Sequence, residues 1–258
     1  MSLKKRRIKR KIGALSRELP IIIYKITDST NTQAKLYAEG DKCGNAVFIA
    51  DEQTAGRGRL GRSFISQDKK GLYLSILVGG PLPSDFALSL TTYMLVIASR
   101  AIEKLTATEP KIKWVNDIYL GNRKLAGILT EGRATEDGSS LEYAVVGIGI
   151  NIAAQSFDSE VSKIATTVED ECGHTVDVNT LAALIVKDFF SNISLAGTKG
   201  IADEYRSRSF LIGERVTVIK PTESYEATVE NITDKCELVL TLTDGTTEVL
   251  STGEVSVR

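Results

Sequence analysis

Arginine and glycine alternate in residues 53–64, which read Gln-Thr-Ala-Gly-Arg-Gly-Arg-Leu-Gly-Arg-Ser-Phe. Each guanidinium can donate two parallel hydrogen bonds to a phosphate or carboxylate, and glycine lets the backbone turn its N–H groups toward a ligand. On composition alone, a solvated cationic linker is the commoner interpretation. Strand-like apolar runs at residues 46–50 and 72–78 flank the stretch, so we predict a mobile loop between two core strands that folds over an anionic ligand.

The glycines of this loop also satisfy the dinucleotide-binding spacing Gly-x-Gly-x-x-Gly, at Gly56, Gly58 and Gly61. That fingerprint requires a helix directly after it and an acidic residue about 20 positions later. Here residues 64–71 are polar and lead into a predicted strand, and long arginine side chains would crowd the close approach that a dinucleotide needs. We therefore reject a dinucleotide-binding fold.

A second concentration of functional groups lies in residues 111–131, which we interpret as two strands joined by a Gly-Asn turn. Lys113, Asn116, Asp117 and Lys124 would gather near the strand ends, where ordinary hairpins carry no such density of charged and amide groups. An exposed lysine such as Lys124 is by base rate only a solubilising charge. The density of the cluster nevertheless indicates a binding site.

Two glycines, Gly147 and Gly149, lie inside the next predicted strand, residues 143–152. Glycine weakens a strand because it has no side chain to pack. Its presence there indicates close approach by a ligand or by another backbone.

The first predicted strand, residues 21–26, ends in a cluster of helix-capping residues at 28–31, and residues 32–39 are compatible with a helix. The cluster is simply a cap, or it aims hydroxyl and N–H groups at a ligand from a strand-to-helix junction. Both interpretations stay open.

Composition describes a soluble globular protein with one substantial core and a small appendage, because 42% of the 258 residues are apolar and 25% are charged. No apolar run approaches the ~20 residues of a membrane span. The charged N-terminus lacks the apolar region of a secretory signal, so we expect a cytoplasmic protein without membrane contact. Cys43, Cys172 and Cys236 are expected to be reduced thiols, and the lone His174 a surface residue with little support for zinc.

Positive charge is concentrated near the N-terminus, where seven of the 32 basic residues lie between Lys4 and Lys11. The rest of the chain then carries 25 basic against 33 acidic residues. Residues 1–19 are expected to form a basic arm. Short basic termini of this kind are usually exposed to solvent. They are too few for a helix-turn-helix domain, so sequence-specific DNA binding is not expected.

The remaining periodicity predicts an α+β fold whose mixed or antiparallel sheet is covered by helices. A long apolar helix capped by Ser84 covers residues 86–105. Further helices are expected from Asn179 and over residues 201–207, followed by four short strands from Arg215. Fewer than fifty C-terminal residues make a marginal core, so we expect this part to dock on the larger domain.

Five motifs in this order resemble those of the biotin protein ligases. They are Ser29-Thr30-Asn31, Gln53 with Gly56-Arg57-Gly58-Arg59-Leu60-Gly61-Arg62, Lys113-Trp114-Val115-Asn116-Asp117, Arg123-Lys124-Leu125-Ala126-Gly127-Ile128 and Gly147-Ile148-Gly149-Ile150-Asn151. Residues 213–218 and 253–258 resemble the opening and closing strands of that family's C-terminal SH3-like β-barrel. Phe64, Gln67 and Val115 depart from the tryptophan and prolines that are usual there.

The resemblance implies a catalytic domain at residues 20–208, related to class II aminoacyl-tRNA synthetases, and a barrel domain at residues 209–258. It implies a monofunctional ligase without an N-terminal DNA-binding domain. Biotin and ATP, with Mg²⁺, would form biotinyl-5′-AMP, and a lysine of the biotin carboxyl carrier protein of a carboxylase would take the biotin. Carboxylate attack on phosphorus needs positioning and charge stabilisation more than a covalent nucleophile, which suits an arginine-rich site.

The resemblance also assigns residues to roles. The biotin-binding residues would be Ser29, Thr30, Asn31, Gln53, Gly56, Arg57, Lys124, Gly127, Gly147 and Gly149. The residues that bind ATP or the adenylate would be Arg59, Arg62, Phe64, Trp114, Asn116, Asn151 and Arg258. Lys124, Arg57 and Arg59 would be catalytic, and Asp117 would assist through Mg²⁺. Trp114 would stack on a ring, with packing at a strand end as the alternative.

Two other functions are weighed against this one. Lipoate or octanoate ligases and transferases share the catalytic fold, although the Gly-Arg-Gly-Arg-x-Gly-Arg loop and the 253–258 ending are not expected in them. A biotin-sensing transcriptional repressor is the other, supported only by the basic arm. Self-association as a homodimer is left open.

Overall fold

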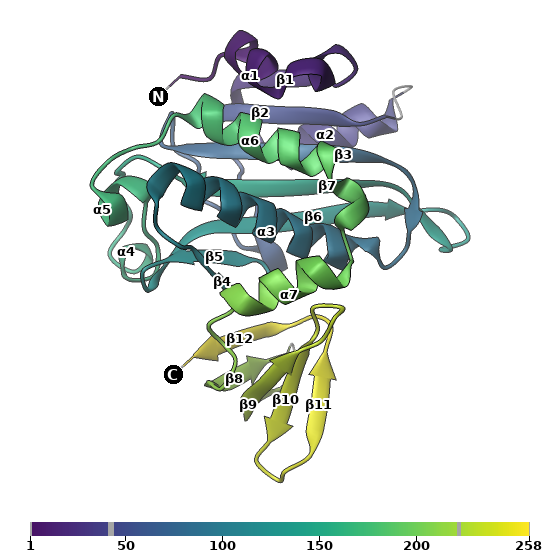
Figure 1. Cartoon of the computed structure of the whole chain (residues 1–258), viewed down its shortest axis with the longest axis vertical. Helices are drawn as coiled ribbons and strands as arrows, with labels where there is room; N and C mark the ends of the chain where they lie inside the picture. Colours follow the sequence, from purple (N-terminus) through teal and green to yellow (C-terminus); the bar gives the residue numbers. More distant parts are fainter. Residues whose placement is uncertain (1, 41–43, 221–222, 258) are drawn as a thin grey trace.

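Two β-sheets organise the chain, one of seven strands and one of five (Figure 1). The computed structural model describes residues 2–40, 44–220 and 223–257. The strands of the large sheet are β1 (Ile21–Thr27), β2 (Ala46–Gln53), β3 (Gly71–Pro83), β4 (Lys111–Lys113), β5 (Asp117–Leu120), β6 (Arg123–Ala134) and β7 (Ser140–Asn151). Their order is β1-β2-β3-β7-β6-β5-β4, and only the β1–β2 pair is parallel. The predicted mixed sheet of an α+β fold is confirmed.

Helices cover both faces of this sheet (Figure 1). The α-helices are α1 (Lys5–Ile12), α2 (Thr30–Glu39), α3 (Phe86–Thr106), α4 (Val161–Ile164), α5 (Val168–Cys172), α6 (Val178–Ser191) and α7 (Lys199–Arg208), and the 3₁₀ turns are η1 (Gly13–Arg17), η2 (Arg59–Gly61) and η3 (Ile193–Leu195). On one face α3 lies with α1, α6 and α7, whereas α2 packs on the opposite face against β2, β3 and β7. The expected cap of α3 is wrong, because its N-cap residue is Asp85 rather than Ser84, and no side chain caps it.

The apolar composition of α3 is explained by its place in the core. Among the described residues, α3 is the one helix long and apolar enough to cross a membrane. In the structure, 67% of the apolar stretch of this helix is buried by the sheet and the neighbouring helices.

Strand alternation gives the large sheet two faces. One carries the main core, and the other, called the polar face below, carries a smaller apolar cluster under α2 and, beside it, polar residues and glycines. Successive side chains of a strand point to opposite faces, and the apolar residues of β3 and β7 that join the main core include Leu72, Leu74, Ile76, Val146, Ile148 and Ile150. The residues between them therefore share the face on which α2 lies. These include Ser75 of β3 and both interior glycines of β7.

Residues 111–120 do not form the single strand that we expected. They form β4 and β5, separated by a turn at Trp114–Asn116. The strand is interrupted at Asn116, which forms hydrogen bonds with Ile128 of β6. The Asn116 carbonyl accepts from Ile128 N at 2.9 Å, and Asn116 Nδ2 donates to Ile128 O at 2.9 Å. The turn directs Trp114 toward the C-terminal sheet.

The C-terminal sheet has five antiparallel strands instead of the four expected. They are β8 (Arg215–Ile219), β9 (Ser224–Ile232), β10 (Leu238–Leu242), β11 (Thr247–Leu250) and β12 (Glu254–Val257), in the order β11-β10-β9-β8-β12. This sheet packs against the larger domain through Trp114, which is 3% exposed and donates from Nε1 to Cys236 O at 2.9 Å. Arg206 of α7 donates to Ile232 O at 2.7 Å.

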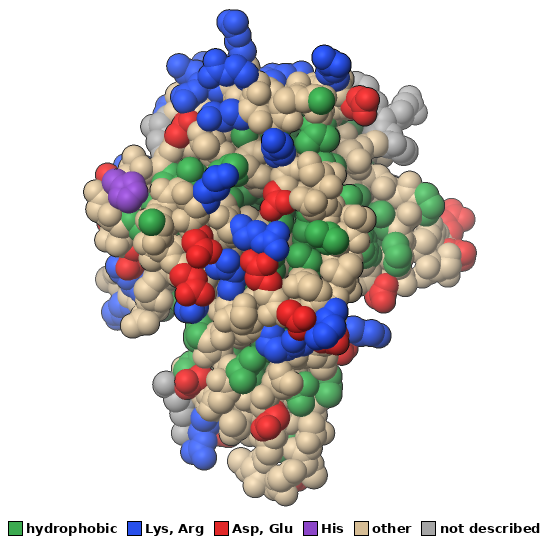
Figure 2. Space-filling view, viewed as in Figure 1, with side chains coloured by type: hydrophobic (Ala, Val, Ile, Leu, Met, Phe, Trp, Pro, Cys, Tyr) green, Lys and Arg blue, Asp and Glu red, His purple; other side chains and the backbone are tan. Residues whose placement is uncertain are grey.

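The basic N-terminal segment is a docked helix, not a solvated arm. Ile8 and Ile12 of α1 are buried, and the backbone N–H of Lys4 donates to Asn179 Oδ1 at 2.6 Å. Arg7 pairs with Asp177 at 2.9 Å. Lysine and arginine side chains gather at this end of the molecule (Figure 2).

Two of the three cysteines and the histidine lie within the described residues, and His174 Nδ1 is 3.0 Å from Cys172 O. Cys172 and Cys236 are free thiols, and Cys43 lies outside the described residues. His174 is exposed, as expected.

Candidate active site

A cavity of about 380 Å³ lies on the polar face of the large sheet, between the arginine loop, the α2 N-terminus and the C-terminal domain. Most residues that the sequence singled out line it. They are Ser29, Thr30, Asn31, Gln53, Arg57, Arg59, Arg62, Phe64, Trp114, Asn116, Asp117, Lys124, Gly127, Gly147, Gly149 and Asn151. The fold thus brings together residues from five separate motifs.

One end of the cavity is a network of neutral polar groups at the start of α2. Gln53 Oε1 accepts from Thr30 N at 2.8 Å and from Thr30 Oγ1 at 3.1 Å, and Gln53 Nε2 donates to Ser66 Oγ at 2.9 Å. Ser75 Oγ lies 2.7 Å from Thr30 Oγ1 and 2.6 Å from Asn31 Oδ1. Because Thr30, Asn31 and Ser75 are almost completely buried, this end presents a fixed set of donors and acceptors.

Ser29 is the N-cap residue of α2 by position, but its side chain makes no capping hydrogen bond. It lines the cavity instead. The structure therefore favours ligand contact over capping at this junction.

Three glycines of β6 and β7, Gly127, Gly147 and Gly149, form the floor of the cavity, where the absence of side chains leaves space. Gly127 is paired with Gly149 across the two strands. A Cβ on Gly149 would lie 2.5 Å from the Phe64 ring, and a Cβ on Gly147 would lie 2.1 Å from Asn31 Oδ1. The predicted close approach to Gly147 and Gly149 is confirmed, and the approaching groups are the side chains of Asn31 and Phe64.

The arginine loop has hydrogen bonds of its own. Gly58 N donates to Arg62 O at 2.7 Å, and Phe64 N donates to Gly56 O at 2.9 Å. Gly56 does not line the cavity; a Cβ there would lie 2.4 Å from Phe64 O, so the glycine is needed where the two ends of the loop meet. Gly61 has a φ of 74°, in the left-handed region that favours glycine.

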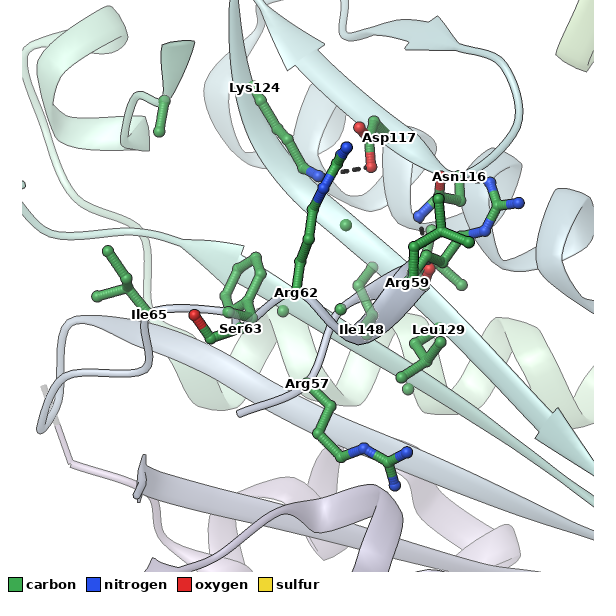
Figure 3. Close-up of a pocket in the computed structure, with 18 of the residues that line it drawn as sticks. Arg57, Arg59, Arg62, Ser63, Ile65, Asn116, Asp117, Lys124, Leu129 and Ile148 are labelled. Carbon is green, nitrogen blue, oxygen red and sulfur yellow. Dashed lines mark hydrogen bonds and ion pairs between the residues drawn. The ribbon is translucent and has the colours of Figure 1, made fainter. Parts of the chain in front are cut away.

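The three arginines of the loop point in different directions (Figure 3). Arg57 pairs with Glu131 of β6 at 3.2 Å. Arg59 approaches Asn116 Oδ1 at 3.3 Å. Arg62 donates both terminal nitrogens to Glu254 of β12 at 2.8 Å, which ties the loop to the C-terminal domain.

Lys124 lies at the cationic end of the cavity, where its Nζ is 2.7 Å from Asp117 Oδ1 (Figure 3). Its side chain passes over Gly127, where a Cβ would lie 3.3 Å from Lys124 Nζ. Lys113 also lines this end and forms no ion pair within the described parts of the chain. Burial lowers the pKa of Lys113, although the charges of Asp117 and Glu254 act to raise it.

Comparison with known proteins places this site in a family. Residues 23–151 match the biotin/lipoate A/B protein ligase family, and residues 211–258 match the biotin protein ligase C-terminal domain. The chain is 32% identical over 254 residues to the biotin--[acetyl-CoA-carboxylase] ligase of Mycobacterium tuberculosis, covering 95% of this chain and 91% of that protein. The chain belongs to the biotin protein ligase family. It superposes on the biotin protein ligase from Aquifex aeolicus in complex with biotin and ATP with a TM-score of 0.77 and 27% identity, covering 93% and 98% of the two chains.

Another relative in the family is longer than this chain. The bifunctional ligase/repressor BirA of Bacillus subtilis is 33% identical over 159 residues, which are 61% of this chain and 48% of that protein. The chain thus matches about half the length of that relative.

Some cavity residues of this family member were not predicted. They come from the segment after β7 and from the start of β12, and they include Phe157, Asp158, Val161, Ile164 and Glu254. The segment is held beside Lys124, because Thr166 N donates to Lys124 O at 2.9 Å, and Asn151 Nδ2 donates to Thr166 O at 3.1 Å. Nothing in its local sequence marks it as part of a site.

The remaining predicted residues of the ligase site have mixed outcomes. Arg258 lies outside the described residues. Trp114 lines the cavity but is packed against the C-terminal domain through its bond to Cys236, as the packing alternative predicted. Phe64 packs on Gly149 and meets Tyr73 edge-on, with ring centroids 6.4 Å apart.

Proposed function

We propose that the protein activates biotin with ATP and transfers it to a lysine of a biotin carboxyl carrier protein. In the first step a biotin carboxylate oxygen attacks the α-phosphorus of ATP, and the bond to pyrophosphate breaks. In the second step the lysine amine attacks the carbonyl carbon of biotinyl-5′-AMP. The amide forms, AMP leaves, and the amine proton passes to solvent.

The observation that carries this proposal is the polarity of the cavity. One end is neutral and polar, at Thr30, Gln53 and Asn31, and the other is cationic. Such a cavity suits a ligand with a neutral hydrogen-bonding head and an anionic tail. Biotin has a ureido ring at one end and a carboxylate at the other, and that carboxylate must meet phosphates.

The cationic end has the charge that the first step needs. Five cationic side chains line the cavity, Arg57, Arg59, Arg62, Lys113 and Lys124, against three acidic ones, Asp117, Asp158 and Glu254. We assign Lys124 to the biotin carboxylate and the α-phosphate, where negative charge grows as the carboxylate attacks. Arg59 and Lys113, which form no ion pair among the described residues, are assigned to the other phosphates, whereas Arg57 and Arg62 pair with carboxylates and hold the loop in place.

The neutral end is assigned to the ureido ring. Ser29, Thr30 and Gln53 supply hydroxyl and amide groups there, and the glycine floor leaves room for the ring and chain of biotin. Asn116 and Asn151, which both line the cavity, are assigned to the nucleotide.

Apolar side chains of two segments are proposed to keep water from the mixed anhydride. Leu60 and Ile65 of the arginine loop line the cavity together with Phe157, Val161 and Ile164 of the segment after β7. Hydrolysis of biotinyl-5′-AMP would waste the activated biotin, so closure of these segments protects the second step.

Magnesium fits this site only as an ion that arrives with the nucleotide. Among the described residues, no three or more histidine, cysteine, aspartate or glutamate side chains gather into a metal site. Asp117, the proposed ligand, already pairs with Lys124. Mg²⁺ commonly binds through one or two carboxylates and substrate phosphates, and we derive no step through it.

Biotin-dependent exchange of labelled pyrophosphate into ATP tests the first step. The protein should catalyse exchange with biotin and not with lipoate or octanoate, because the ureido ring alone matches the hydrogen bonds of the neutral end. Exchange driven by lipoate at the rate seen with biotin, or no exchange with either acid, would refute the proposal. A cytoplasmic location and a biotin carboxyl carrier protein as the acceptor remain predictions.

A further inference from the structure

Glu131 of β6 lies beneath the cavity and joins three residues around it. Its Oε1 is 2.8 Å from Lys35 Nζ and 3.2 Å from Arg57 Nη1, and its Oε2 accepts from Asn31 Nδ2 at 2.9 Å. Only 19% of its side chain is exposed. Glu131 does not line the cavity, so any effect on a ligand must pass through these partners.

The Glu131 carboxylate fixes the orientation of the Asn31 amide. An ionised carboxylate only accepts hydrogen bonds, so the nitrogen of Asn31 must face Glu131 and its oxygen must face Ser75, 2.6 Å away. Asn31 Nδ2 also donates to Leu129 O at 3.2 Å, which requires the same orientation. Glu131, with the shorter of the two bonds, and the Leu129 carbonyl thus set the orientation of the Asn31 amide together.

Glu131 also holds the start of the arginine loop. Among the described residues, Arg57 forms no other ion pair. The carboxylate is ionised at neutral pH: burial acts to raise its pKa, but hydrogen bonds from Lys35 and Asn31 and the charges of Lys35 and Arg57 lower it below its ordinary value. The Arg57 contact is therefore charged.

We infer that Glu131 is a positioning residue that sets Arg57 and Asn31 for the ligand, and so couples the arginine loop to the neutral end of the cavity. Among the described residues, this carboxylate is the group that contacts both Asn31 and Arg57. The inference rests on the proposed function for the identity of the ligand. The anchoring of the loop is independent of that identity.

The test compares Glu131→Gln with Lys35→Gln. The glutamine keeps the size of the side chain but loses the charge, and its amide can satisfy either orientation of Asn31. We expect a 10-fold to 100-fold higher KM for biotin, the range of one or two decades that a lost charged hydrogen bond commonly causes. The kcat of adenylation should change less than about threefold, since Lys124 is intact. Lys35→Gln removes the third partner but leaves Arg57 and Asn31 held, and its KM should stay near the parental value.

Two further readouts separate positioning from general stability. Arg57→Gln combined with Glu131→Gln should raise KM by less than the product of the two single effects, because the residues act through one contact. Without any ligand, trypsin should cleave the loop at Arg57, Arg59 or Arg62 several-fold faster in Glu131→Gln than in Lys35→Gln.

The outcomes are distinct. A parental KM in Glu131→Gln, or an equal rise in Lys35→Gln, would overturn the inference. If the parental protein makes no biotinyl-5′-AMP, the proposed function fails, and the ligand-free cleavage rates alone then decide whether Glu131 anchors the loop. Equal cleavage rates in the two variants would overturn that part too.

Discussion

Lys124 shows how surroundings determine what a single side chain can do. Its ammonium is partly exposed, which alone would describe a surface lysine, but it lies over a glycine and beside Asp117 at the end of the cavity. Asp117 holds the ammonium in place and leaves its remaining N–H donors for an anion. Under the proposed function, a fixed positive charge in this position would stabilise the negative charge that develops on the α-phosphate oxygens.

Lys124→Ala should therefore slow the formation of biotinyl-5′-AMP by on the order of 10²-fold or more, the usual cost of one such electrostatic contact. The measurement is single-turnover adenylate formation with saturating biotin and ATP. Lys187→Ala, at an exposed position of α6, is the control and should behave as the parent. If Lys124→Ala forms biotinyl-5′-AMP at the parental rate, Lys124 is only a solubilising surface charge and the assignment is wrong.

At the scale of single residues, the sequence predicted those cavity residues that stand in short stretches rich in charged, amide or glycine residues. It did not predict Glu131, whose partner Asn31 lies 100 positions away, because its importance depends on which strands are neighbours. A signal was available: Glu131 has the same strand parity as Gly127 and Leu129 and so shares the polar face. Applying the alternation of β6 to its whole length would have placed Glu131 there.

The arginine loop is the element on which the site depends most. The sequence predicted a mobile loop ordered by its ligand, but the structure gives it an internal turn and ties Arg57 and Arg62 to carboxylates of two domains. Among the described residues, Arg59 differs from both, since its hydrogen bonds to Asn116 and Thr252 are long, at 3.3 and 3.5 Å. It is therefore the arginine that we propose binds the adenylate.

Arg59→Gly should leave adenylation largely intact but release biotinyl-5′-AMP about 10-fold to 100-fold faster, at ~1.4 kcal/mol for each tenfold. The escaped anhydride should then label lysines of a bystander such as serum albumin. Arg133→Ala, at an exposed position of β6 outside the cavity, provides the control. Retention of the adenylate at the parental rate, without bystander labelling, would show that Arg59 does not hold it.

Elements with strong periodicity were predicted well, whereas turns set by distant bonds were not. Strands β2 and β3 and helices α3 and α6 follow their apolar patterns. The break between β4 and β5 was missed because residues 111–120 look like one continuous strand, and the hydrogen bonds of Asn116 to Ile128 of β6 are not visible in the local sequence. The segment after β7 was missed for the same reason, because it is held at the site by the hydrogen bond from Asn151 Nδ2 to Thr166 O.

At the scale of the whole molecule, the two domains share the site. The C-terminal domain contributes Gly253, Glu254 and Val255 to the cavity lining, and Arg62 and Trp114 bind it to the loop and to the large sheet. The expected docking of the small domain follows from its marginal core. The helical N-terminus was hidden by its basic composition, although Ile8 and Ile12, four residues apart, mark one buried face of a helix.

The central claim is that this cavity makes and transfers an activated biotin. The most direct measurement is ATP-dependent transfer of labelled biotin to a purified carrier domain, followed by mapping of the modified residue. The account predicts one biotin on the acceptor lysine, no label without ATP, and none when that lysine is replaced by arginine. Failure to label a carrier that an established biotin ligase labels under the same conditions would contradict it.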